Sequence, residues 1–151
     1  MKVGVISDTH GLLRPEAVSG LRGVKHILHA GDVGNPAILG QLREIAPLTA
    51  IRGNIDSGGV CARLPAVELI ELNGVSIYML HDVHELDLEP VAVGIQVVIS
   101  GHSHKPLIAW KKGVLYFNPG SAGPRRFSLP VSIGFLEISN DEVQPQLMTI
   151  G

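Results

Sequence analysis

The sequence predicts an α/β fold in which two mixed β-sheets pack face to face as a sandwich flanked by helices. Short apolar runs rich in β-branched residues recur along the 151 residues, and helical patterns separate only the early runs. The first half of the chain therefore alternates strand and helix, which favours parallel pairing with right-handed crossovers. The second half has short turns between its strands, which favours antiparallel pairing.

Eight apolar runs are expected to form strands. The first five are nearly continuous in apolar residues, as strands buried on both faces should be. In chain order, the expected strands are residues 3–7, 26–30, 48–51, 75–80, 97–100, 114–117, 132–138 and 143–150.

Two helices are expected between the early strands. Asn35 is an N-cap residue, and Pro36 follows it at the first helical position. The residues that then share one apolar helical face are Ile38, Leu39, Leu42 and Ile45. Residues 15–21 form a shorter expected helix, and residues 86–93 a third that Pro90 limits.

The composition narrows the class of protein. No segment of low complexity divides the chain, so residues 1–151 are expected to form one domain. The net charge of -2 and the 4% aromatic share disfavour nucleic acid as a partner, because such binding relies on basic patches and stacking platforms. Cys61 is the single cysteine, which indicates a reducing compartment. Without a signal-peptide pattern or an apolar run of roughly 18 residues, a soluble cytoplasmic protein with no membrane partner is expected.

Polar side chains that can bind metal follow five of the expected strands. The seven candidates are Asp8, His10, Asp32, Asn54, His81, His102 and His104. Because the carboxyl ends of parallel strands share one edge of a sheet, these side chains are expected to meet there. Glycines at positions 11, 31, 53 and 101 stand beside them, either for close packing or as ordinary turns.

This mixture of side chains suits two divalent metal ions. Asp carboxylates are hard donors that can bridge cations, and imidazoles favour Mn, Ni, Zn, Fe or Co over Ca or Mg. Seven ligands exceed the four of a single tetrahedral zinc. Two divalent ions carry more positive charge than Asp8, Asp32 and a bridging hydroxide together neutralise. The centre therefore keeps a net positive charge, which should attract a phosphate group.

The motifs resemble the calcineurin-like metallophosphoesterase pattern in the same order: Asp-x-His, Gly-Asp, Gly-Asn-His-Asp/Glu, His and Gly-His-x-His. The segments that carry the resemblance are Asp8-Thr9-His10, Gly31-Asp32, Gly53-Asn54-Ile55-Asp56, His81, Gly101-His102-Ser103-His104 and Asn118-Pro119-Gly120-Ser121. The chain looks like the small bacterial and archaeal phosphodiesterase branch of that superfamily.

The resemblance implies a dimetal centre in which Asp32 bridges two ions. One ion would be held by Asp8, His10, Asp32 and His104, and the other by Asp32, Asn54, His81 and His102. The implied catalytic set is Asp32, Asn54, His81 and Arg52. Arg52 occupies a position where some members bind phosphate, and an exposed residue at a strand end is the equal alternative.

Two positions depart from the family pattern. Ile55 stands where the family often has a histidine that assists the leaving group, and isoleucine has no proton to give. Hydrolysis should therefore favour good leaving groups such as aryl alcohols, unless His84, Asp56 or Asp82 substitutes. Asp82 replaces the usual glycine after His81, where it could hold the His81 ring or point to solvent.

Two functions remain open from the sequence. The first is hydrolysis of phosphodiesters, with phosphomonoesters less favoured, by a metal-bridging hydroxide on a small phosphate-ester substrate. Two divalent ions are the expected cofactors, with manganese favoured. The alternative is a catalytically weak metal-binding scaffold for protein–protein interaction, similar to the retromer subunit of the superfamily. A homodimer is the default expectation for a small soluble enzyme.

Overall fold

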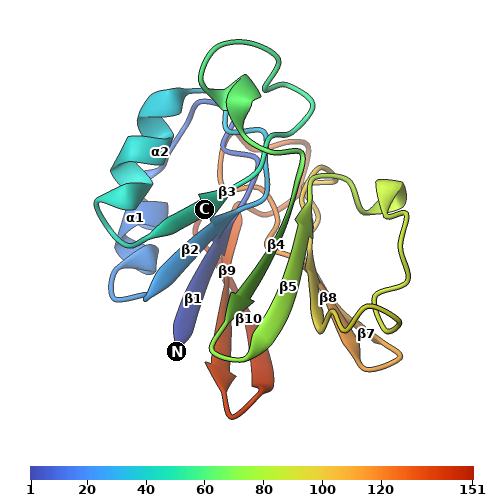
Figure 1. Ribbon diagram of the computed structural model, residues 1–151. Helices are drawn as coiled ribbons and strands as arrows, with labels where there is room; N and C mark the ends of the chain where they lie inside the picture. Colours follow the sequence, from blue (N-terminus) through green and yellow to red (C-terminus); the bar gives the residue numbers. More distant parts are fainter.

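The computed structural model describes all residues 1–151, and it has ten strands, two α-helices and two short 3₁₀ turns (Figure 1). The strands are β1 (Lys2–Ile6), β2 (His26–His29), β3 (Leu48–Ala50), β4 (Val67–Leu72), β5 (Val75–Leu80), β6 (Val97–Ile99), β7 (Leu107–Lys111), β8 (Val114–Asn118), β9 (Ser132–Ser139) and β10 (Glu142–Thr149). The helices are α1 (Pro15–Leu21) and α2 (Pro36–Arg43), and the 3₁₀ turns are η1 (Cys61–Arg63) and η2 (Val83–Glu85).

Two five-stranded mixed sheets form the predicted sandwich. The first sheet has the order β10-β9-β1-β2-β3, and its β1, β2 and β3 are parallel, as the alternation of strand and helix predicts. The second has the order β4-β5-β6-β8-β7. The expectation of antiparallel pairing in the second half is wrong for its centre, where β5, β6 and β8 run parallel. The reason is that the chain leaves β6, forms β7 at the edge and returns through β8 between them.

The main core lies between the two sheets. Val3, Val5 and Leu28 of the first sheet pack against side chains of the second, such as Ile77 and Phe117, and all five are almost fully buried. Their apolar, largely β-branched composition suits a pleated surface that is buried on this face. This core fixes the two sheets relative to each other and so aligns their strand ends.

Both α-helices cover the outer face of the first sheet (Figure 1). Asn35 caps α2 by accepting a hydrogen bond from the amide of Ala37, as expected. The expected helix at 86–93 is wrong: these residues form loop and turns after η2. Leu86 and Leu88 of this loop nevertheless pack on the outer face of the second sheet. Neither α-helix has the length and apolar character needed to span a bilayer.

Candidate metal centre

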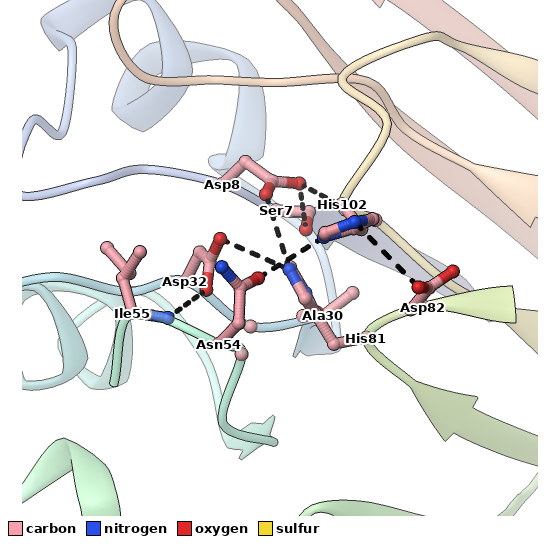
Figure 2. A network of polar contacts seen from close by, with 12 residues as sticks. Ser7, Asp8, Ala30, Asp32, Asn54, Ile55, His81, Asp82 and His102 are labelled. Carbon is pink, nitrogen blue, oxygen red and sulfur yellow. Dashed lines mark hydrogen bonds and ion pairs between the residues drawn. The ribbon is translucent and has the colours of Figure 1, made fainter. Parts of the chain in front are cut away.

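The seven expected ligand residues lie just beyond the carboxyl ends of five strands, at one end of the sandwich. β1, β2 and β3 lead into Asp8, His10, Asp32 and Asn54, and β5 and β6 lead into His81, His102 and His104. Figure 2 shows the side chains of Asp8, Asp32 and His81 pointing toward one another from different strands. The parallel strands in the centre of each sheet bring these residues together.

Asp8 is the fully buried carboxylate at the middle of the group. Its Oδ2 accepts hydrogen bonds from the Ser7 hydroxyl at 2.7 Å and from the amide of His102 at 3.1 Å. Its Oδ1 has no hydrogen-bond partner. The Nε2 atoms that surround Oδ1 are those of His104 at 3.4 Å, His10 at 3.6 Å and His81 at 3.7 Å. One oxygen is thus anchored, and the other faces three imidazoles.

Asp32 is arranged in the same way. Its Oδ1 accepts the amide of Ile55 at 3.0 Å, and its Oδ2 lies 3.2 Å from Nε2 of His81 and 3.4 Å from Nε2 of His10. His81 is oriented from behind, because its Nδ1 donates to the carbonyl of Ala30 at 2.7 Å. The Nε2 of His81 therefore turns toward the two carboxylates, as is typical of a metal-binding histidine.

Asn54 and His102 lie at the exposed side of the group. The Nδ1 of His102 is 3.2 Å from Oδ1 of Asn54, and its Nε2 is 3.8 Å from Oδ2 of Asp82 (Figure 2). Asp82 therefore faces His102. It does not hold the His81 ring, which was one of the two alternatives that the sequence left open for it. This side of the group is open to solvent, since Asn54 and His102 are both exposed.

The donor set fits divalent cations. Buried atoms without a hydrogen-bond partner include Asp8 Oδ1, His10 Nε2 and His81 Nε2, and an unpartnered buried polar atom is costly unless something binds it. Two ligand atoms that share one cation at about 2.1 Å lie roughly 3.0–3.4 Å apart. The separations of 3.2–3.7 Å between these carboxylates and imidazoles are close to that spacing and mostly too long for hydrogen bonds.

Two overlapping groups of potential ligand atoms emerge. One joins Asp8, His10 and His104, and the other joins Asp8, Asp32 and His81. Asp8 belongs to both groups, whereas the family resemblance gives the shared position to Asp32. Both carboxylates contact imidazoles of the two groups, so either could lie between two cations.

Five of the seven candidate ligand residues have left-handed backbone. Their φ angles are 55° at Asp8, 46° at His10, 57° at Asp32, 69° at His102 and 64° at His104. This conformation is disfavoured by roughly 1–2 kcal/mol for a residue other than glycine. Such strain is concentrated at functional sites, where the surroundings hold it in place.

The charges of the cluster are strongly coupled. Burial raises the pKa of Asp8, but the neighbouring rings of His10 and His104 outweigh it and hold that pKa well below its usual range. Burial lowers the pKa of His81, but the adjacent Asp32 carboxylate and the Ala30 carbonyl raise it to about 9. Without a cation, protons balance the carboxylates, so a bound cation would have to displace them.

Three of the glycines noted in the sequence pack directly against ligand residues. A Cβ at Gly31 would lie 2.7 Å from Nδ1 of His81, one at Gly53 would overlap the Asp32 carboxylate, and one at Gly101 would lie 2.6 Å from Oδ2 of Asp8. Gly11 has open space around it and is an ordinary turn residue with φ of 82°.

Several supporting residues were not identified from the sequence as such. Ser121 donates its hydroxyl to the backbone carbonyl of Asp8, and Asn118 donates to the carbonyl of Gly101. Both come from the segment 118–121, which belongs to the motif set. Ser7 carries no sequence signal of its own, because its hydrogen bond to Asp8 Oδ2 depends on the rotamer of the Asp8 side chain.

The candidates for a substitute acid have different positions. Asp56 is buried, and it accepts the amides of Val33, Gly34 and Gly53, so it is a structural anchor of the ligand loops and not an acid facing the site. His84 donates from its ring to Asp82 at 3.0 Å and is 88% exposed.

His29 is a buried structural histidine behind the ligands. Its Nδ1 accepts the amide of Gly31 at 3.1 Å, so its Nε2 carries the proton and donates to the Thr9 hydroxyl at 3.0 Å. Thr9 in turn donates to the carbonyl of Val33 at 2.9 Å. Burial lowers the pKa of His29 to about 4, which keeps the ring neutral.

This histidine should make the protein sensitive to acid. The unfolded ring has a pKa near 6.5 and the folded ring about 4, so the unfolded state binds more protons between these values. Stability should therefore fall as the pH drops from about 6.5 to 4, by on the order of 3 kcal/mol. Urea unfolding of chelated protein across this range measures the effect. His29→Gln should flatten the pH dependence, and an unchanged slope in that variant would contradict this account.

The fold and the cluster together define a metal-binding α/β sandwich protein. The chain belongs to the calcineurin-like phosphoesterase superfamily, whose domain model matches residues 1–141. The family resemblance and the fold expected from the sequence are both confirmed. Membership implies a hydrolase that acts on phosphoesters with divalent metal ions.

Individual relatives agree with this family. A probable metallophosphoesterase of Methanothermobacter thermautotrophicus is 34% identical, with 100% of this chain and 94% of the relative covered. A phosphodiesterase of Methanocaldococcus jannaschii is 26% identical, with 94% and 96% covered. Vps29 of Entamoeba histolytica, solved in complex with Zn²⁺, has a TM-score of 0.76 at 23% identity over all of both chains. At that identity the last likeness concerns the fold alone.

Proposed function

We propose that this protein hydrolyses phosphodiesters with two divalent cations held by the Asp–His cluster. The observation that carries the proposal is the convergence of three buried, unpartnered ligand atoms, namely Asp8 Oδ1, His10 Nε2 and His81 Nε2. The Methanocaldococcus jannaschii relative that is called a phosphodiesterase supports the diester as substrate.

We assign the ligands of the two cations by motif position and proximity. One cation would be held by Asp8, His10, Asp32 and His104, and the other by Asp32, Asn54, His81 and His102. The separation of 3.4 Å between His104 Nε2 and Asp8 Oδ1 supports the first set, and that of 3.2 Å between His81 Nε2 and Asp32 Oδ2 supports the second. Cations held there, with manganese favoured, would supply positive charge for a phosphoryl group and would lower the pKa of a water nucleophile toward neutrality.

The protein's own groups would orient the substrate. Hydrolysis breaks one P–O ester bond, joins the oxygen of water to phosphorus and transfers a proton to the departing alcohol. Arg52 lines the cavity next to Asn54, and one guanidinium nitrogen donates to the carbonyl of Leu64 at 2.8 Å. The remaining guanidinium N–H groups are available for phosphoryl oxygens.

The departing alcohol would receive little help from the protein. Ile55 supplies only its backbone amide, to Asp32, and its side chain is 42% exposed. Asp56 is occupied by three amides, and His84 does not line the cavity. Asp82 does line it, but its Oδ1 already accepts the amide and the ring N–H of His84. A positioned general acid contributes roughly 10²–10⁴-fold in rate, so esters with poor leaving groups should be cleaved slowly.

The direct test is hydrolysis of bis-para-nitrophenyl phosphate and of para-nitrophenyl phosphate by purified protein. We expect turnover that requires added manganese or nickel, stops on chelation and favours the diester. The diester is a monoanion, whereas the monoester is a dianion. The Asp8 and Asp32 carboxylates therefore repel the diester less, which is the physical reason for the preference.

The scaffold is the second candidate, and the edge strand β7 is the observation that favours it. Leu107, Ile108 and Trp110 of this strand are 47%, 40% and 55% exposed, and an exposed apolar edge is typical of a binding surface. Absence of turnover while manganese is bound, measured by metal analysis, would favour this function over the enzyme.

A further inference from the structure

A cavity of about 400 Å³ lies beside the metal centre, and the function proposed above does not assign its contents. Asn54, His81 and His102 of the centre contribute to its lining, and so does Arg52, which precedes Asn54 by two residues. His81 is buried, and its unpartnered Nε2 belongs to the ligand cluster. A phosphate group at the centre would therefore place one of its ester substituents in this cavity, whose volume suits a small organic group.

Three carboxylates make part of the cavity lining acidic. Asp82, Glu85 and Asp87 belong to the lining, and Arg52 is its single Lys or Arg residue. His84 contacts Asp82, but Glu85 and Asp87 have no ion-pair partner. Carboxylates in a cavity beside a phosphate site would repel a second phosphate and attract a cation.

An aromatic ring belongs to the same lining. Tyr78 of β5 lines the cavity together with apolar side chains that include Val67 and Leu80. Burial and the charge of Asp87 raise the pKa of the Tyr78 hydroxyl, which agrees with a position close to that carboxylate. A neutral aromatic ring beside carboxylates is a favourable environment for an alkylammonium group.

We propose that the cavity binds a positively charged ammonium alcohol as one ester substituent of the phosphodiester substrate. The inference rests on the proposed function, because the metal centre is what places the phosphate. The phosphodiester anion would face the centre while the ammonium group would face Glu85, Asp87 and Tyr78. Diesters of this kind would be selected over those whose substituent is neutral or carries a further phosphate.

The kinetic test compares two substrates that differ only in charge. Para-nitrophenyl phosphorylcholine and para-nitrophenyl neohexyl phosphate have the same leaving group and nearly the same shape. We expect kcat/KM of the choline ester to be about tenfold higher, because the exposed carboxylates of Glu85 and Asp87 attract its ammonium group. The ratio should fall towards one in the double variant Glu85→Gln/Asp87→Asn. The matched control Glu71→Gln/Glu89→Gln removes two exposed charges outside the cavity and should retain the ratio.

A binding test separates failure of this inference from failure of the catalytic proposal. The chain has two tyrosines, and Tyr78 lines the cavity whereas Tyr116 does not. In a protein with labelled tyrosine rings, choline should shift the NMR signals of Tyr78 and leave those of Tyr116 in place, and neohexanol should shift neither. If neither ester is hydrolysed but choline shifts Tyr78, the cavity assignment stands and the catalytic proposal fails. Equal kcat/KM for both esters, or no choline-dependent shift of Tyr78, would overturn the inference.

The source of the ammonium ester can be distinguished by competition. Glycerophosphocholine and phosphatidylcholine vesicles present the same group in solution and on a membrane. Inhibition of choline-ester turnover by the first would identify a soluble diester, and inhibition by the second a lipid headgroup. Inhibition by neither would count against the proposal.

Discussion

Replacing Asp32 with alanine is expected to abolish metal-dependent hydrolysis, with a fall in kcat/KM of at least about 10³-fold. Loss of a residue that only supports a metal ligand costs roughly 10–100-fold in affinity or activity, and a direct ligand should exceed this. Asp32 Oδ2 lies within 3.4 Å of the Nε2 atoms of both His10 and His81, so its removal would affect both cations. Steady-state kinetics on the aryl diester, with metal content of the variant, measures the loss.

A second substitution separates ligand loss from strain. Asp32 has φ of 57°, so alanine adds backbone strain to the missing carboxylate, whereas asparagine tolerates this conformation and can still accept the Ile55 amide. Asp32→Asn should keep the fold but lose most of the activity and the rise in Tm that manganese gives the native protein. Asp141→Asn, at an exposed left-handed position in the β9–β10 turn, is the matched control and should behave as the native protein. Full activity in Asp32→Ala would refute the dimetal mechanism.

Gly53→Ala is expected to lower metal affinity and activity by at least about 100-fold without removing any ligand. Loss of a residue that only orients a metal ligand costs roughly 10–100-fold, and this substitution displaces the Asp32 carboxylate itself. The new Cβ would overlap Oδ1 and the amide of Asp32 and would lie 2.7 Å from its Cγ, so Asp32 must move. Overpacking of a tight site also destabilises a protein, typically by about 1–3 kcal/mol. Manganese titration followed by Tm, together with kinetics, gives both effects.

The control for this prediction lies in the same loop. Gly58 has no atom within 4 Å of an added Cβ and no positive φ, so Gly58→Ala introduces a methyl group into open space. It should leave metal affinity, activity and Tm nearly unchanged. If Gly53→Ala binds manganese as tightly as Gly58→Ala, the packing of Gly53 against Asp32 does not position the carboxylate.

Much of the fold could be predicted from local sequence. β1, β2, β3 and β5 are apolar runs bounded by polar or glycine residues, and the Asn35-Pro36 pair marks the start of α2. The signals of β1 and β2 are strong because burial of nearly every residue leaves little freedom of composition. The convergence of the candidate ligand residues could be predicted for a related reason, since they come directly after strands whose ends share an edge.

Two strands and one loop could not be predicted in this way. β4 alternates apolar residues with Glu68 and Glu71, and β7 is exposed along most of its length, so neither is a continuous apolar run. Each becomes a strand by pairing with a stronger neighbour, β5 or β8. The apolar residues of 86–93 suggested a helix, but a loop containing Pro90 covers the sheet equally well, because burial depends on side-chain contact and not on the backbone form.

The sequence by itself determined the chemical inventory: seven candidate ligands in an order typical of one superfamily, and an Ile55 that has no proton to donate. Only the tertiary structure decided how that inventory is arranged. In the structure Asp82 lies beside His102 and His84. Asp56 accepts hydrogen bonds from three backbone amides. Glu85 and Asp87 line a cavity and have no ion-pair partner. The physical reason is that residue type fixes which atoms a side chain can offer, whereas long-range packing fixes which of those atoms have already found a partner.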